Sequence, residues 1–97
     1  QTMQKSHAIA NGVFVVAVNR VGHEGPEGAG LEFWGHSFVC DPAGVVLAEA
    51  GAGEETLVVE LDLGRIEEQR RGWPFLRDRR IDAYAGLLRR FLDQGPR

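Results

Sequence analysis

The chain has 97 residues, of which 11 are basic and 14 acidic, and 43% are hydrophobic. This composition is typical of a soluble globular domain and argues against disorder, a collagen repeat or a membrane span. With one cysteine and no signal-peptide pattern, we expect a cytoplasmic protein without an internal disulfide or a cysteine-based zinc site.

The first predicted elements are a helix and a buried strand. Residues 2–11 place apolar side chains three to four apart, which predicts a helix, and Asn11-Gly12 supplies left-handed residues to end it. Residues 13–19 are β-branched and nearly all apolar, which predicts a strand covered on both faces. The polar, glycine-rich residues 22–31 are expected to form a surface loop.

The middle of the chain predicts a β-hairpin. Two short strands, at residues 36–40 and 45–49, flank the sequence Asp-Pro-Ala-Gly at 41–44. Proline suits the second position of a turn and glycine its last position, so this segment is expected to reverse the chain. Residues 56–62, TLVVELD, predict a further strand.

The last third of the chain predicts helices. Asp62 is a candidate N-cap for a helix over residues 63–71, which Gly72 is expected to end. Residues 75–83 are expected to be irregular, and a final helix is expected over residues 83–92.

No complete set of catalytic or metal-binding residues is found in the sequence. Cys40 ends an apolar strand, where a buried hydrophobe is a better interpretation than a nucleophile. The three histidines and Cys40 match no metal-ligand spacing, and the glycines of residues 22–30 lack the pattern of a phosphate loop. We therefore expect no metal and no cofactor.

Charge is distributed unevenly along the chain. Residues 61–97 carry nine arginines against six acids, whereas residues 1–60 carry two basic residues against eight acids. Most of the arginines alternate with acidic residues and can pair with them locally. A nucleic-acid partner normally needs a clear basic face, so we expect none.

Three segments carry a resemblance to a known family. They are HAIANGVFVVAVNRVGHEG (residues 7–25), LEFWGHSFVCDPAGVVLAEAG (31–51) and DLGRIEEQRRGWPFLRDRRIDAYAGLLRRF (62–91). Together they resemble the C-terminal portion of the carbon–nitrogen hydrolases of the nitrilase superfamily. The subgroup that the segment WPFLRDRRIDAY resembles most is that of the N-carbamoylputrescine amidases.

The resemblance implies a fold and an assembly. It implies an α/β fold in which residues 1–97 form the C-terminal portion of one domain, an α-β-β-α sandwich of four layers. Residues 1–62 would supply a helix, sheet strands and a hairpin, and residues 63–97 a helix and a C-terminal tail. The family pairs such sandwiches in homo-oligomers, with the C-terminal segment packed on the partner subunit.

The resemblance also implies a chemistry. The family hydrolyses non-peptide C–N bonds through a cysteine thioester, with a glutamate base and a lysine that stabilises the oxyanion. All three lie upstream of the matched region, so we expect no catalytic residue in this chain and no activity from it alone. The expected reaction of the full-length parent converts N-carbamoylputrescine and water to putrescine, carbon dioxide and ammonia, in polyamine biosynthesis. The alternatives are a β-ureidopropionase or ω-amidase type of enzyme, and a non-catalytic dimerisation module.

Four residues are substrate-pocket candidates: Asn19, Arg20, Glu24 and His36. Asn19 and Arg20 mark the carboxyl end of the predicted strand, where ligands bind in open α/β sheets. Glu24, with Glu27 and Glu32, would favour a cationic amine, unless these acids only increase solubility. His36 stands where the family usually has a glycine, which affects the expected size of the pocket.

Aromatic residues and arginines alternate in the tail and are interface candidates: Trp73, Phe75, Arg77, Arg79, Arg80 and Tyr84. Both residue types are enriched at interface cores. The alternative is that Trp73 and Phe75 pack within the chain. The expected partners are therefore a small-molecule amide or carbamoyl amine and a second copy of the chain, without a membrane or nucleic acid.

Overall fold

The first helix, α1 (Thr2–Asn11), ends where the sequence predicts. Gly12 adopts the left-handed conformation with φ 60° and ψ 49°, and the cap amide bonds back to the carbonyls of Ala8 and Ile9. Asn11 remains helical, and its side-chain amide donates to the carbonyl oxygen of His7 at 2.9 Å. The structure is a computed structural model that describes residues 1–93.

Three strands form the central sheet: β1 (Val15–Ala17), β4 (Phe38–Cys40) and β5 (Val46–Glu49). Their order is β1-β4-β5, and both neighbouring pairs are antiparallel. The predicted hairpin of β4 and β5 is therefore confirmed. The turn between them closes with a bond from the Gly44 amide to the Asp41 carbonyl, 2.9 Å long.

The core is small and lies between α1 and one face of the sheet. Ala8 of α1 packs against Phe38 and Cys40 of β4, and these three residues are at most 3% exposed. Cys40 is fully buried, as expected of a small apolar side chain.

The other face of β1 is uncovered, so the prediction of a strand buried on both faces is wrong within this chain. Successive side chains of a strand point to opposite faces, and only one face meets α1. Val16 is 59% exposed and Val18 is 87% exposed.

A second hairpin replaces the surface loop expected at residues 22–31. Strands β2 (Val21–Glu24) and β3 (Leu31–Trp34) pair antiparallel, with His23 opposite Glu32. Glycines allow the tight connection, since a Cβ atom at Gly30 would lie 2.2 Å from the carbonyl oxygen of Glu24. Glycines of this kind are typical of loops, so the sequence pattern did not indicate the paired strands on either side of them.

The second half of the chain has one α-helix, α2 (Gly64–Gly72). The N-cap is Leu63, one residue after the predicted Asp62. The Asp62 carboxylate still accepts a bond from the Gly64 amide at 3.0 Å, so it holds the first turn from the position before the cap. Two contacts tie α2 to the rest. The Arg65 guanidinium lies 3.6 Å from the Asp41 carboxylate, and the Arg70 Nε donates to the Asn11 carbonyl at 3.3 Å.

Two expectations for the second half are wrong. Residues 56–62 are irregular, because no described strand pairs with them, and Val58 is 96% exposed. Residues 83–92 contain only the 3-10 segments η1 (Ile81–Ala83), which begins earlier, and η2 (Ala85–Leu88). A short helix is marginal unless an apolar face packs, and Leu88 is 91% exposed.

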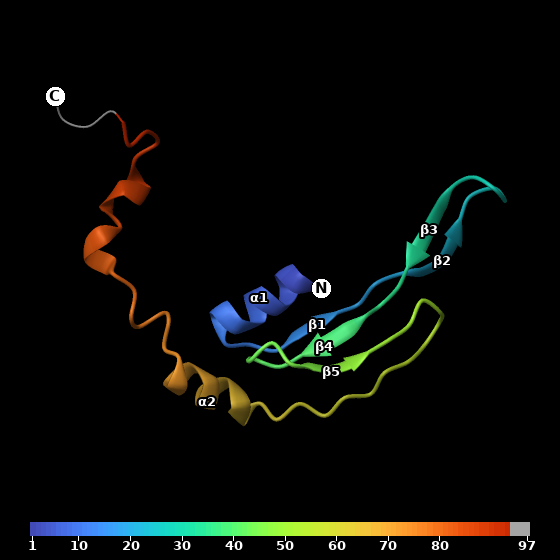
Figure 1. Cartoon of the computed structure of the whole chain (residues 1–97), viewed down its shortest axis with the longest axis horizontal. Helices are drawn as coiled ribbons and strands as arrows, with labels where there is room; N and C mark the ends of the chain where they lie inside the picture. Colours follow the sequence, from blue (N-terminus) through green and yellow to red (C-terminus); the bar gives the residue numbers. More distant parts are fainter. Residues whose placement is uncertain (94–97) are drawn as a thin grey trace.

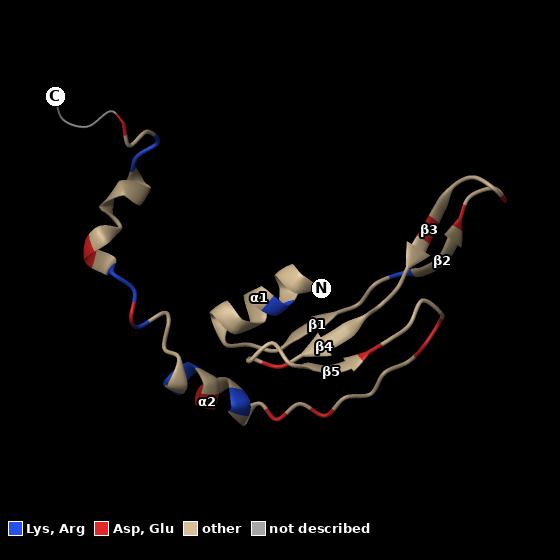
Figure 2. Cartoon of the chain, in the orientation of Figure 1, with Lys and Arg blue, Asp and Glu red and all other residues tan. Residues whose placement is uncertain are grey.

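The molecule is elongated, as Figure 1 shows, and it is thin along the viewing direction of that figure. Its radius of gyration is 20.0 Å and its extents are 63 × 39 × 13 Å. A compact domain of 100 residues has a radius of gyration of about 13 Å. Figure 2 shows basic residues along α2 and the tail, and acidic residues mainly on the β2–β3 hairpin and the segment before α2. No helix within residues 1–93 is long and apolar enough to cross a membrane.

Candidate functional site

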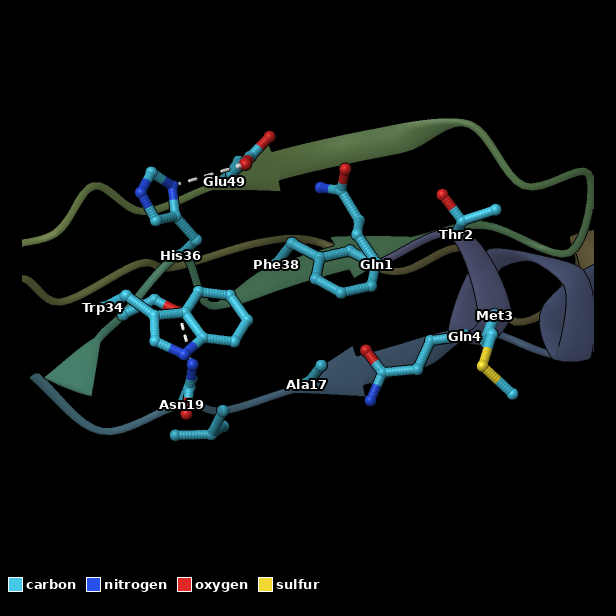
Figure 3. A pocket seen from close by; sticks show the side chains of 12 residues that line it. Gln1, Thr2, Met3, Gln4, Ala17, Asn19, Trp34, His36, Phe38 and Glu49 are labelled. Carbon is cyan, nitrogen blue, oxygen red and sulfur yellow. Dashed lines mark hydrogen bonds and ion pairs between the residues drawn. The ribbon is translucent and has the colours of Figure 1, made fainter.

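A cavity of about 830 Å³ lies between the first turn of α1 and the central sheet, next to the end of β1. Its size is within the range of small-molecule sites. Most of its wall is apolar or amide-bearing, and it includes two of the four predicted pocket residues (Figure 3). The lining residues are Gln1, Thr2, Met3, Gln4, Ala17, Val18, Asn19, Trp34, Gly35, His36, Phe38 and Glu49.

Asn19 organises the floor of this cavity. Its side-chain nitrogen donates to the Gly35 carbonyl at 2.7 Å, and its backbone amide donates to the Ser37 hydroxyl at 2.8 Å. Its side-chain oxygen accepts a bond from the Arg20 amide at 2.9 Å. Asn19 thus ties the end of β1 to the segment that leads into β4, and its amide group is engaged by the protein itself.

His36 and Glu49 form the polar rim of the cavity. His36 has a φ of 58°, and no other non-glycine residue within residues 1–93 has a positive φ. Its amide donates to the Gly51 carbonyl at 3.1 Å. Its Nδ1 lies 3.7 Å from Glu49 Oε1, and its ring is 6.4 Å from the Trp34 ring, centroid to centroid. Figure 3 shows the His36 and Glu49 side chains joined across this rim.

Glu49 is the pocket residue that sequence reasoning missed. It ends β5, opposite Phe38 of β4, whereas the acids singled out in the sequence belong to the glycine-rich segment. The available signal was the antiparallel register of the predicted hairpin, which places the end of its second strand beside the start of its first.

Arg20 and Glu24 lie outside the cavity. The Arg20 guanidinium pairs with the Glu24 carboxylate at 3.1 Å and stacks over the Phe33 ring at 4.2 Å from its centroid. Both partners of the ion pair are 59% exposed. An exposed pair of this kind adds little stability, and its charges largely satisfy each other.

His23 links the two strands of the β2–β3 hairpin, which is called the outer hairpin below. Its Nδ1 lies 3.0 Å from Glu32 Oε2, and its Nε2 lies 3.1 Å from the Pro26 carbonyl oxygen. Both partners only accept hydrogen bonds, so the ring satisfies both of them only when both nitrogens carry protons. The Pro26 carbonyl and then the Glu32 side chain raise the pKa of His23 above its ordinary value.

The predicted interface residues lie in the extended tail. Trp73 and Phe75 stack with ring centroids 6.2 Å apart, and their side chains are 64% and 48% exposed. With Arg77 and Arg79 they border a second cavity of about 590 Å³, which also contacts the end of α1. Arg80 forms a bidentate pair with Asp82, at 2.7 and 2.9 Å, which lowers the pKa of that carboxyl.

The cysteine of the chain lies away from the cavity. Cys40 has no exposed surface from which a sulfur could attack a substrate. Histidine, cysteine and acidic residues form no group of metal-ligand type in the part of the chain that the structure describes. The cavity lining therefore includes no cysteine.

Comparison with known proteins identifies the family. The family model described as carbon-nitrogen hydrolase matches residues 1–71. The chain belongs to the carbon–nitrogen hydrolase family. This carbon–nitrogen hydrolase chain is 43% identical over 91 residues to the N-carbamoylputrescine amidase of Solanum tuberosum, covering 89% of this chain and 30% of that protein. It is 46% identical over 81 residues to an (R)-stereoselective amidase of a Pseudomonas species, covering 84% of this chain and 28% of that protein.

A solved structure shows the same arrangement of the chain. The crystal structure of a carbon–nitrogen hydrolase from Helicobacter pylori G27 matches with a TM-score of 0.81 and 55% sequence identity. The match covers 94% of this chain and 32% of that one. This carbon–nitrogen hydrolase chain thus spans about a third of the length of its relatives, and its flat, open shape is that of a part of their α/β fold.

The geometry of His23 predicts a pH-dependent hairpin. Folding raises the pKa of His23, so the protonated ring stabilises the β2–β3 pairing. This stabilisation is fully present below the pKa of the unfolded chain, about 6.5. It is lost as the pH rises through the higher pKa of the folded chain. An NMR titration of the His23 ring in the folded protein measures the pKa directly. Glu32→Gln should lower it part of the way and leave the Pro26 contact intact. A His23 that titrates at the same pH in folded and urea-unfolded protein would contradict the prediction.

Proposed function

We propose that this chain is part of a longer amidase, the parent amidase, which hydrolyses N-carbamoylputrescine to putrescine, carbon dioxide and ammonia in polyamine biosynthesis. The observation that carries the proposal is the match of 41–43% identity to plant enzymes of that name over 89% of this chain. The cysteine, glutamate and lysine of the reaction are proposed to lie upstream of Gln1, since this chain covers 30% of such an enzyme and its cysteine is buried away from the cavity.

Exposed valines on the far side of β1 support the proposed four-layer sandwich. In an α-β-β-α arrangement, α1 is one outer layer and the central sheet is the next. The exposed Val16 and Val18 would then pack on the second sheet, which the rest of the parent amidase supplies. Residues 1–62 and 63–97 are proposed as two parts of this one domain.

The tail is proposed to bind a second subunit. It leaves the sheet after α2 and extends away from it, as Figure 1 shows. Its exposed aromatic rings and arginines are the residue types that dominate interface energetics. The proposed contact residues are Trp73, Phe75, Arg77, Arg79, Arg80 and Tyr84. Homo-oligomerisation in the cytoplasm, without a nucleic-acid or membrane partner, completes the proposal.

Within the cavity, Asn19 and His36 are proposed to shape the substrate-binding end. The small-molecule substrate, an amide or a carbamoyl amine, would lie against Trp34 and Phe38. Arg20 and Glu24 keep a proposed role at the entrance, because the hairpin that carries them begins where the cavity ends.

A second candidate is another amidase of the same family, of the β-ureidopropionase or ω-amidase type. The observation that favours it is the 46% identity over 54 residues to an omega-amidase of Saccharomyces cerevisiae, beside the 46% identity to the (R)-stereoselective amidase. A dimerisation module without catalysis would lack the upstream cysteine, glutamate and lysine.

The test is ammonia release by the parent amidase. We expect kcat/KM for N-carbamoylputrescine to exceed that for N-carbamoyl-β-alanine and for an ω-amide by at least about 10-fold, since a difference of 1.4 kcal/mol in transition-state binding has that effect. A preference for an acidic substrate would favour the second candidate. A parent that lacks the upstream cysteine, glutamate and lysine, and that releases no ammonia from any of the three substrates, would favour the dimerisation module.

A further inference from the structure

The cavity beside α1 carries one carboxylate. Of its twelve lining residues, Glu49 is the only one with an acidic side chain, and none is a lysine or arginine. The Glu49 side chain is 43% exposed, and its ionic neighbour His36 lies at 3.7 Å, beyond hydrogen-bond distance, so the carboxylate can still accept bonds from a ligand. The acids of the outer hairpin do not line the cavity, and Glu24 and Glu32 are paired with Arg20 and His23.

The backbone of His36, which faces Glu49, is strained. A histidine with φ 58° occupies a region that L side chains rarely adopt. The surrounding contacts hold it there, since the His36 amide is bonded to the Gly51 carbonyl and its ring faces Glu49 at 3.7 Å. This backbone conformation holds the His36 ring beside Glu49. The ring therefore limits the positions that the Glu49 carboxylate can adopt.

The remaining wall suits an aliphatic chain. Trp34, Phe38, Met3 and Ala17 present apolar surface to the cavity. An aromatic face and a carboxylate together favour an alkylammonium group, the first through the ring quadrupole and the second through charge.

We propose that Glu49 recognises the cationic amine of the substrate and that His36 is a positioning residue for its carboxylate. The inference rests on the proposed function, since it assumes that the parent amidase binds an aliphatic carbamoyl amine. In this proposal Glu49 is the source of specificity for a cation, in place of the acids of the glycine-rich segment, Glu24, Glu27 and Glu32.

The experiment compares two ureas of the same shape in the parent amidase. N-carbamoylputrescine ends in an ammonium group, and N-pentylurea has a methyl group in its place. Glu49→Gln should lower kcat/KM for N-carbamoylputrescine about 10- to 100-fold through KM, because it removes a charged acceptor. It should change kcat/KM for N-pentylurea less than about 2-fold, which also shows that the variant is folded. Glu27→Gln, outside the cavity, is the matched control and should change neither value.

His36→Gly tests the positioning role. Glycine relieves the backbone strain, so the thermal midpoint should rise or stay the same. We expect the ratio of kcat/KM for the cationic urea to that for the neutral urea to fall about 3- to 10-fold nevertheless. A residue with only a structural role would change the midpoint and leave this ratio unchanged.

The outcomes separate the two levels of the proposal. If the wild-type parent prefers N-carbamoylputrescine and Glu49→Gln keeps that preference, the assignment of Glu49 is wrong and the proposed function stands. If Glu49→Gln lowers both rates equally, Glu49 is structural. If the wild-type parent prefers N-pentylurea or cleaves neither urea, the proposed function fails and the assignment falls with it.

Discussion

The isolated 97-residue chain should release no ammonia from N-carbamoylputrescine and should show no cooperative thermal transition as a monomer. Its accessible surface is 8065 Å², whereas a compact folded protein of this size exposes about 5,500 Å². The excess exceeds the area of a standard protein–protein interface, about 1,600 Å² in total. Large apolar side chains such as Val18, Val58 and Leu88 account for part of it, each more than 85% exposed. Surface of this kind drives association or unfolding when its partner is absent.

Three measurements on the isolated chain check this expectation. Circular dichroism on heating reports cooperativity, light scattering at two concentrations reports association, and an ammonia assay reports activity. The parent amidase is the control and should melt cooperatively and be active. A sharp melt of a monomer, independent of concentration, would show that the three-residue core of Ala8, Phe38 and Cys40 is sufficient for folding. Ammonia release that is abolished by Cys40→Ala would overturn the structural interpretation of Cys40.

Asp41→Ala should lower the free energy of unfolding of the parent amidase by about 3 kcal/mol, since hydrogen bonds to charged groups contribute about 1.5–3 kcal/mol each. Asp41 is 5% exposed, and its Oδ1 accepts bonds from the amides of Ala43 and Val45, both at 2.9 Å. Alanine leaves both donors without a partner in a turn that closes the β4–β5 hairpin. Urea unfolding of the two proteins measures the difference.

Two matched variants separate the contributions of Asp41. Asp41→Asn keeps an oxygen acceptor for the turn but loses the charge that strengthens both bonds and faces Arg65 at 3.6 Å, so it should cost about 1–2 kcal/mol. Asp62→Ala removes an exposed side chain that accepts one bond, from Gly64, and should cost about 0.5–1 kcal/mol. Equal effects of all three substitutions would show that the turn does not depend on the buried carboxylate.

Local patterns in the sequence were sufficient for the elements whose bonds close within a few residues. The end of α1 at Gly12, the Asp41–Gly44 turn and the bond of Asp62 to the first turn of α2 each depend on a side chain or conformation next to the element itself. The family was also readable, because its motifs extend through these same segments and are matched over residues 1–71.

Elements that depend on a distant partner were not readable in this way. Residues 56–62 have the composition of a strand, yet the described chain offers them no edge with which to pair. Residues 83–92 have an apolar side without a surface on which to bury it, so only short 3-10 segments form. The pairing of β2 with β3 was hidden because the glycines of its turn are the same residues that indicate a loop.

Which side chains share the cavity was decided by tertiary structure. Asn19, His36 and Glu49 are far apart in sequence, and the antiparallel order β1-β4-β5 brings the end of β1, the approach to β4 and the end of β5 to one edge. Arg20 and Glu24 instead lie at the outer hairpin, outside the cavity. Sequence motifs determined the family, the turns and the caps, because these rest on local chemistry. The strand order determined which carboxylate lines the cavity, because register acts between segments that the sequence separates.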